Sequence, residues 1–112
     1  MSTDDPLMTW APAACTLPTA ERPLREAEFD ELFGTSSAGV ERPDPTHLRI
    51  ALDPTPEVAA RAAALAVRET RCCSFFTFAV VASAGQVRLD VTVTDAQVDV
   101  LDALQRRAGE AA

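Results

Sequence analysis

The stretch HLRIALDPTPE, residues 47–57, decides the fold because it joins a strand directly to a helix. The apolar residues at positions 48, 50 and 52 fall on one side of the chain, and positions 47, 49 and 51 fall on the other. This alternation predicts a half-buried strand. Thr55 can then cap a helix that Pro56 opens, since a proline suits the first helical turn.

The predicted second helix carries one inward-facing stripe with spacings of four, three, four and three residues. The stripe consists of Val58, Ala62, Leu65, Glu69 and Cys72. Residues at these separations lie on one helix face. Glu69 therefore lies on the inner stripe, where a carboxylate needs a partner or a proton.

Five further elements follow from the same patterns. We expect a first helix from Thr19 or Pro23 to Phe33, stopped by Gly34, and a short strand at Val40 to Arg42. Residues 75–81 are apolar on both faces, as in a central strand, and residues 83–86 form a short hairpin connection. Residues 87–93 alternate as a strand. The last helix begins with a capping box at Thr94, and its inner stripe is Val98, Leu101, Leu104 and Ala108.

The order of elements is helix, two strands, helix, two strands, helix. It predicts an α+β fold, a two-layer sandwich in which helices cover one face of a four-stranded, mainly antiparallel sheet. A ferredoxin-like shape is compatible with this order. Residues 15–109 form the single domain, and residues 1–14 form an irregular N-terminal arm with Trp10 near its end.

The composition limits the class of protein. The 112 residues suit one domain, and a net charge of −7 argues against nucleic acid as a partner. The apolar runs are too short to span a membrane, and the start of the chain does not have the pattern of a secretory signal. We therefore expect a cytoplasmic protein. Lysine is absent, which excludes Schiff-base chemistry on a lysine side chain. An exposed sheet face or edge could support a homodimer.

Chemistry is suggested most clearly by the cysteines. Cys72 and Cys73 are adjacent, Glu69 precedes them by three and four positions, and the third cysteine is Cys15. An odd number of cysteines in a reducing compartment argues against a structural disulfide framework. A disulfide between the adjacent pair would be strained, because their Cα atoms lie about 3.8 Å apart against a usual minimum of about 4.4 Å.

The cysteines allow two interpretations, a structural role and a metal-binding role. All three can be small buried residues, and Cys15 can simply dock the arm. The alternative is a site for a soft metal or metalloid ion such as Hg(II), As(III), Cu(I) or Zn(II). Adjacent cysteines suit tetrahedral zinc poorly, whereas three sulfurs from Cys15, Cys72 and Cys73 suit Hg(II) or As(III). The sequence therefore predicts these three ligands, with Glu69 beside them.

Glu69 leaves several roles open. It can act as a base, orient a ligand, or pair with an arginine, and its charge would raise rather than lower the pKa of a nearby thiol. His47, the only histidine, is expected on the outer strand face as an ordinary surface residue. Two other functions stay open: a thiol-based redox enzyme that uses Cys72 and Cys73, and an interaction module with structural cysteines.

Three segments carry a resemblance to known proteins: residues 15–18, residues 25–29 and, above all, residues 69–78. With them the chain resembles a group of small, little-characterised bacterial proteins that share a Glu-x-x-Cys-Cys-x-Phe motif. The group is loosely associated with heavy-metal resistance and mercury-type regulators. The resemblance implies that Cys15, Cys72 and Cys73 act together, and it implies no substrate or catalytic mechanism.

Overall fold

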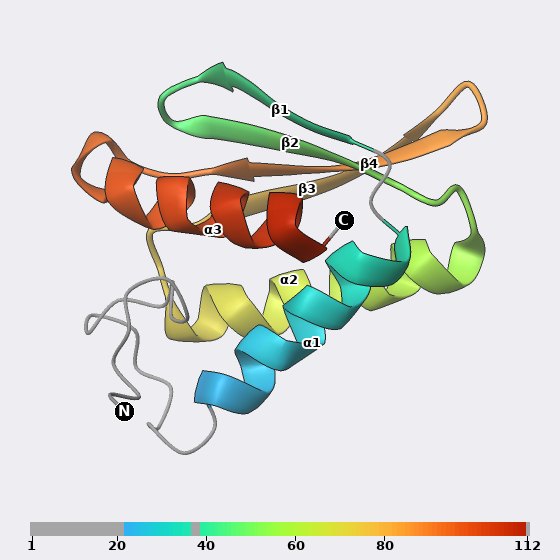
Figure 1. Ribbon diagram of the computed structural model, residues 1–112, viewed down its shortest axis with the longest axis horizontal. Helices are drawn as coiled ribbons and strands as arrows, with labels where there is room; N and C mark the ends of the chain where they lie inside the picture. Colours follow the sequence, from blue (N-terminus) through green and yellow to red (C-terminus); the bar gives the residue numbers. More distant parts are fainter. Residues whose placement is uncertain (1–21, 37–38, 112) are drawn as a thin grey trace.

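The computed structural model describes residues 22–36 and 39–111. In this part of the chain, helices lie on one face of a four-stranded sheet, and the expected α+β order is confirmed (Figure 1). The elements are α1 Arg22–Ser36, β1 Gly39–Asp44, β2 His47–Leu52, α2 Pro56–Cys72, β3 Thr77–Ser83, β4 Gln86–Thr92, the 3-10 helix η1 Asp95–Gln97 and α3 Val98–Ala111. The predicted arm, residues 1–14, lies outside the described residues.

The sheet has the strand order β1-β2-β4-β3, and every neighbouring pair is antiparallel. Strands β2 and β3 therefore run parallel to each other, with β4 between them and α2 as their crossover. This is the split β-α-β unit of ferredoxin-like folds. The order β-β-α-β-β-α from β1 to α3 is a circular permutation of the ferredoxin-like β-α-β-β-α-β, with α1 added in front.

The strand predicted at residues 75–81 begins and ends two residues later than expected, and the prediction that it is central in the sheet was wrong. Strand β3 covers Thr77–Ser83 and lies at the sheet edge, while β4 is central. Its outward residues are small: Ala79 is exposed and Val81 is half-buried. Small apolar side chains tolerate water, so an apolar run cannot by itself distinguish an edge strand from a central one.

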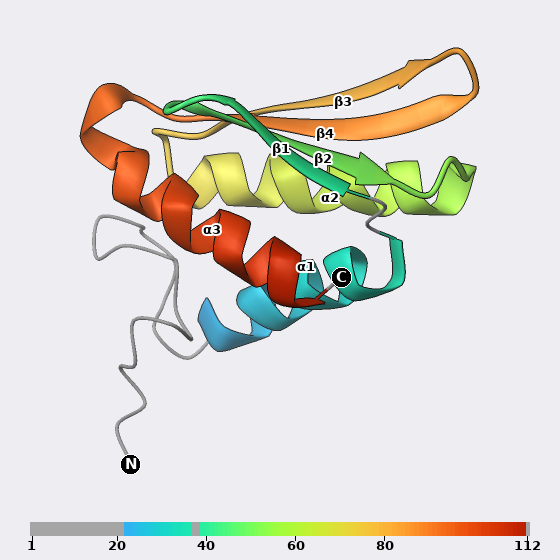
Figure 2. The same cartoon turned by 45° about the horizontal axis from the view of Figure 1, so that its top comes forward.

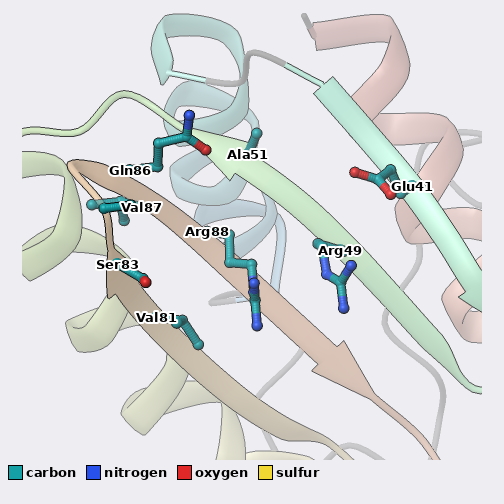
Figure 3. A pocket seen from close by; sticks show the side chains of 9 residues that line it. Glu41, Arg49, Ala51, Val81, Ser83, Gln86, Val87 and Arg88 are labelled. Carbon is teal, nitrogen blue, oxygen red and sulfur yellow. The ribbon is translucent and has the colours of Figure 1, made fainter.

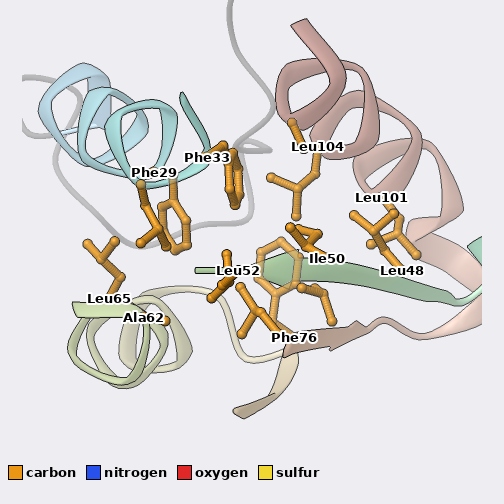
Figure 4. Packing of buried hydrophobic residues seen from close by; sticks show 14 of the residues in the cluster. Phe29, Phe33, Leu48, Ile50, Leu52, Ala62, Leu65, Phe76, Leu101 and Leu104 are labelled. Carbon is orange, nitrogen blue, oxygen red and sulfur yellow. The ribbon is translucent and has the colours of Figure 1, made fainter. Parts of the chain in front are cut away.

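The core lies between the sheet and the three helices (Figure 2). Side chains from every helix converge with those of β2 on this layer (Figure 4). Phe29 of α1 joins the layers, since its ring centroid lies 5.9 Å from that of Phe33 and 6.3 Å from that of Phe78 on β3. The buried positions of α3 are Leu101, Leu104 and Ala108, as expected, whereas Val98 is only partly buried.

Helix and turn geometry explains where the elements begin and end. Thr55 caps α2 as predicted: its Oγ1 accepts a hydrogen bond of 3.2 Å from the backbone N–H of Val58. In the β3–β4 hairpin, Ala84 and Gly85 have φ angles of +53° and +75°. Two successive positive φ angles are the pattern of a type I′ turn, whose twist matches that of the flanking strands.

Two expected helix signals did not act as predicted. Gly34 does not end α1, which continues to Ser36, because a single exposed glycine costs a helix only about 1 kcal/mol. Thr94 makes no side-chain cap. The backbone N–H of Gln97 instead donates to the Thr94 carbonyl oxygen at 2.9 Å, which closes a 3-10 turn and uses the donor that a threonine cap would have taken.

Candidate functional site

The first candidate site lies where α2 ends and the chain turns towards β3. Cys73 and Glu69 are each 1% exposed, so the inward position predicted for Glu69 is confirmed. The backbone N–H of Cys73 donates to the Glu69 carbonyl oxygen at 2.8 Å, and the Phe76 N–H donates to the Cys73 carbonyl oxygen at 3.3 Å. These bonds fix Cys73 in a buried corner, one helical turn after a buried carboxylate.

The sulfur of Cys73 is part of a disulfide. A single bond at Cys73 does not conflict with the expectation that an odd number of cysteines argues against a structural disulfide framework. An odd count excludes only the pairing of every cysteine, and it leaves room for one bond.

The structure tests the predicted set of ligands only in part. Cys15 and the side chain of Cys72 are outside the described residues, so their approach to Cys73 stays a prediction. Within residues 22–36 and 39–111, no three His, Cys, Asp or Glu side chains are placed to hold a metal ion. Of the four predicted site residues, Glu69 and Cys73 are thus the two that the structure describes, and both are buried at the end of α2. The described helices also include none that is long and apolar enough to cross a membrane.

A second polar cluster, which the sequence did not predict, lies on the sheet face away from the helices. Asp90 on β4 is only 9% exposed and accepts three hydrogen bonds. Its Oδ1 accepts from Nε2 of His47 at 2.9 Å and from Nε of Arg49 at 3.1 Å. Its Oδ2 accepts from Nε of Arg88 at 2.9 Å. His47 is on the outer face as expected, but it is part of this cluster rather than an ordinary surface residue.

The surroundings of Asp90 act on its pKa in opposite directions. Partial burial raises the pKa, because it disfavours the charged carboxylate. The hydrogen bonds from Arg88, His47 and Arg49 together outweigh that penalty and hold the pKa of Asp90 below its ordinary value. The carboxylate is therefore the stable form within the cluster. Alternation alone places positions 47, 49, 88 and 90 outward, but only the β2–β4 register sets Arg49 opposite Asp90.

This arrangement predicts a loss of stability in acid. Since the folded-state pKa of Asp90 is lowered, its contribution is fully present above its unfolded-state pKa of about 3.9 and is lost as the pH falls through the lower folded value. We expect Asp90→Asn to lower the free energy of unfolding at pH 7 by about 1–3 kcal/mol, a typical range for hydrogen bonds to charged groups. Urea unfolding at pH 7 and pH 3 measures this, and the deficit of the variant should shrink at pH 3.

The exposed Asp53 offers a matched control, because Asp53→Asn makes the same chemical change outside the cluster. We expect it to leave the free energy of unfolding within about 0.5 kcal/mol of the unchanged protein. An Asp90→Asn variant as stable as this control at pH 7 would contradict the prediction.

Comparisons of the chain with protein-family models, with curated proteins and with solved structures gave no match. The resemblance through the Glu-x-x-Cys-Cys-x-Phe motif therefore stays a prediction. What can be argued about function rests on the buried corner of Glu69 and Cys73 and on the outer sheet face.

Proposed function

We propose that the reduced protein binds a soft metal or metalloid ion through Cys15, Cys72 and Cys73. The observation that carries the proposal is the disulfide at Cys73. A disulfide at Cys73 means that this sulfur has a second sulfur as its bonded neighbour, which supports a site with more than one thiol. After reduction, two neighbouring thiolates can bind one ion at metal–sulfur distances of about 2.3 Å. Thiolates select soft ions such as Cu(I) and, by the same softness, Hg(II) and As(III).

Cys15 is the partner that disulfide geometry favours. Cys72 is adjacent to Cys73, and adjacent Cα atoms lie about 3.8 Å apart, below the range of about 4.4–6.8 Å in which disulfides form without strain. In this proposal the Cys15–Cys73 bond is the oxidised form of the site, and Cys72 supplies the third sulfur when the ion is bound.

Glu69 supports the site as a proton acceptor. Binding of a soft ion to thiols releases protons, because the ligand is the thiolate. In the proposal, the carboxylate of Glu69, which is 1% exposed and lies one helical turn before Cys73, takes up such a proton inside the corner. In Glu69→Gln we therefore expect the ion to bind with more protons released to the buffer.

Anaerobic titration of the reduced protein with Hg(II), As(III), Cu(I) and Zn(II) tests the proposal through charge-transfer absorbance and native mass. We expect one ion per chain, and a loss of affinity of about a thousandfold, or roughly 4 kcal/mol, in Cys73→Ser. Cys15→Ser and Cys72→Ser should each weaken binding as well. Ser74→Ala is the control, since it alters the exposed neighbour of Cys73 and should leave affinity unchanged. Equal affinity in Cys73→Ser and the unchanged protein would refute the proposal.

The same disulfide favours a second candidate, a thiol–disulfide oxidoreductase. In that reaction a reduced thiolate attacks an external disulfide, one external thiolate leaves, and a second protein thiolate displaces the other, so two electrons pass to the substrate. The burial of Cys73 favours a small ion over this bulkier substrate, because attack requires access. A mixed disulfide with glutathione in one single-cysteine variant, combined with no ion binding, would support the enzyme instead.

A further inference from the structure

A shallow pocket, called the hollow below, lies between side chains on the sheet face opposite the helices. Its volume is about 350 Å³, and it is bordered by all four strands and the β3–β4 turn. Figure 3 shows its side chains: Arg49 and Arg88 lie on neighbouring strands, with Glu41 beyond Arg49 on β1. Ser83 and Gln86 line its hairpin end. The hollow is separate from the corner of Glu69 and Cys73, which faces the core on the other side of the sheet.

Arg49 and Arg88 are oriented by hydrogen bonds, and their Nη groups can still bind a ligand. Arg49 pairs with Asp90 across the β2–β4 ladder, and Ala51 pairs with Arg88, so the two arginines are diagonal neighbours. Each donates to Asp90 through Nε. Among the described residues, those are the hydrogen bonds recorded for either guanidinium, and each has two Nη groups that can still donate. Asp90 therefore orients both forks, while their side chains stay 33% and 44% exposed.

The charge of this cluster contrasts with that of the whole chain. Arg49 and Arg88 give +2, and Asp90 together with Glu41, which pairs with Arg49 across β1 and β2, gives −2, so the group is neutral in a protein of net charge −7. The hydroxyl of Ser83 and the amide of Gln86 add donors at the same hollow. Ala51 and Val81, which are small, also line the hollow. Guanidinium forks bind carboxylates and phosphates with two parallel hydrogen bonds.

We propose that this hollow binds a small molecule through an oxyanion group, a carboxylate or a phosphate monoester. Arg49 and Arg88 hold the oxyanion through their Nη groups, and Ser83 and Gln86 at the hairpin end offer polar contacts to another part of the ligand (Figure 3). Glu41 lies at the rim, where its charge disfavours polyanions such as nucleic acid. The same carboxylate can accept a hydrogen bond from a hydroxyl or ammonium group elsewhere on the ligand.

Titration of the full ¹⁵N-labelled chain with inorganic phosphate, phenyl phosphate and benzoate, at constant ionic strength, tests the proposal. The Nε–H resonances of Arg49 and Arg88 report the site. We expect saturable shifts with a Kd below about 1 mM for at least one probe, and the more tightly bound probe separates phosphate from carboxylate recognition. Arg88→Gln should weaken binding at least about tenfold, whereas Glu41→Gln should strengthen it about twofold to fivefold.

Arg106→Gln is the matched control, because Arg106 is exposed on α3, in the helix layer. It should leave Kd unchanged. Thermal melts establish that each variant folds, and Arg88→Lys, which keeps the charge but not the fork, should bind with a Kd between those of Arg88→Gln and the unchanged protein. Shifts that rise linearly without saturation for all three probes, or an equal loss of affinity in Arg106→Gln and Arg88→Gln, would overturn the proposal.

Discussion

Phe29→Ala is expected to lower the free energy of unfolding by about 3–5 kcal/mol, the usual cost of removing a fully buried phenylalanine. Phe29 is 1% exposed and contacts the rings of Phe33 in its own helix and Phe78 on β3. The truncation would leave a cavity between α1 and the sheet, where the surrounding rings cannot move in without leaving their own contacts. Chemical denaturation measures the loss, and the midpoint of thermal unfolding should fall by at least about 12 °C.

Two further variants serve as controls for Phe29→Ala. Phe29→Leu keeps most of the apolar volume and should cost clearly less than Phe29→Ala. Val67→Ala removes methyl groups from a side chain that is 54% exposed on α2, and it should change stability by less than about 0.5 kcal/mol. If Phe29→Ala were no more damaging than Val67→Ala, α1 would not be a packed part of the fold.

The fold was accessible from the sequence because its signals are local. The strict alternation of His47–Leu52 sets which side chains face the helices, and the structure confirms it at Leu48, Ile50 and Leu52. The cap at Thr55 depends only on residues three positions apart. The inward position of Glu69 followed from helical spacing alone.

The larger errors concern contacts between distant parts of the chain, whereas the local errors at Gly34 and Thr94 concern only helix ends. That β3 is an edge strand depends on which neighbour β2 selects, and no residue of β3 encodes that choice. Asp90 meets Arg49 and His47 only through the β2–β4 register, although each outward position was evident. The disulfide at Cys73 could not be read from the number of cysteines, because an odd count still allows one bond.

Reduction of the disulfide is the second change for which we expect a large effect. If Cys15 is the partner, as proposed, the bond closes a loop between positions that are 73 − 15 = 58 residues apart. The loss of such a constraint on the unfolded chain corresponds to about 4 kcal/mol. Denaturation of the oxidised and reduced protein measures the difference. Cys15→Ser should be destabilised to the same extent without reductant, whereas Cys72→Ser, the control, should keep both the bond and its stability.

A soft ion should then replace what reduction removes. An ion held by Cys15 and Cys73 closes the same loop as the disulfide, and a ligand that binds only the folded state stabilises it by about 4 kcal/mol at a thousandfold excess over Kd. The reduced protein with Hg(II) or As(III) should therefore approach the stability of the oxidised protein, while Cys73→Ser should gain far less. A reduced protein as stable as the oxidised one, or a disulfide that persists in Cys15→Ser and disappears in Cys72→Ser, would assign the bond to the adjacent pair. The three-sulfur site would then lose its main support, because nothing would bring Cys15 to the corner of Glu69 and Cys73.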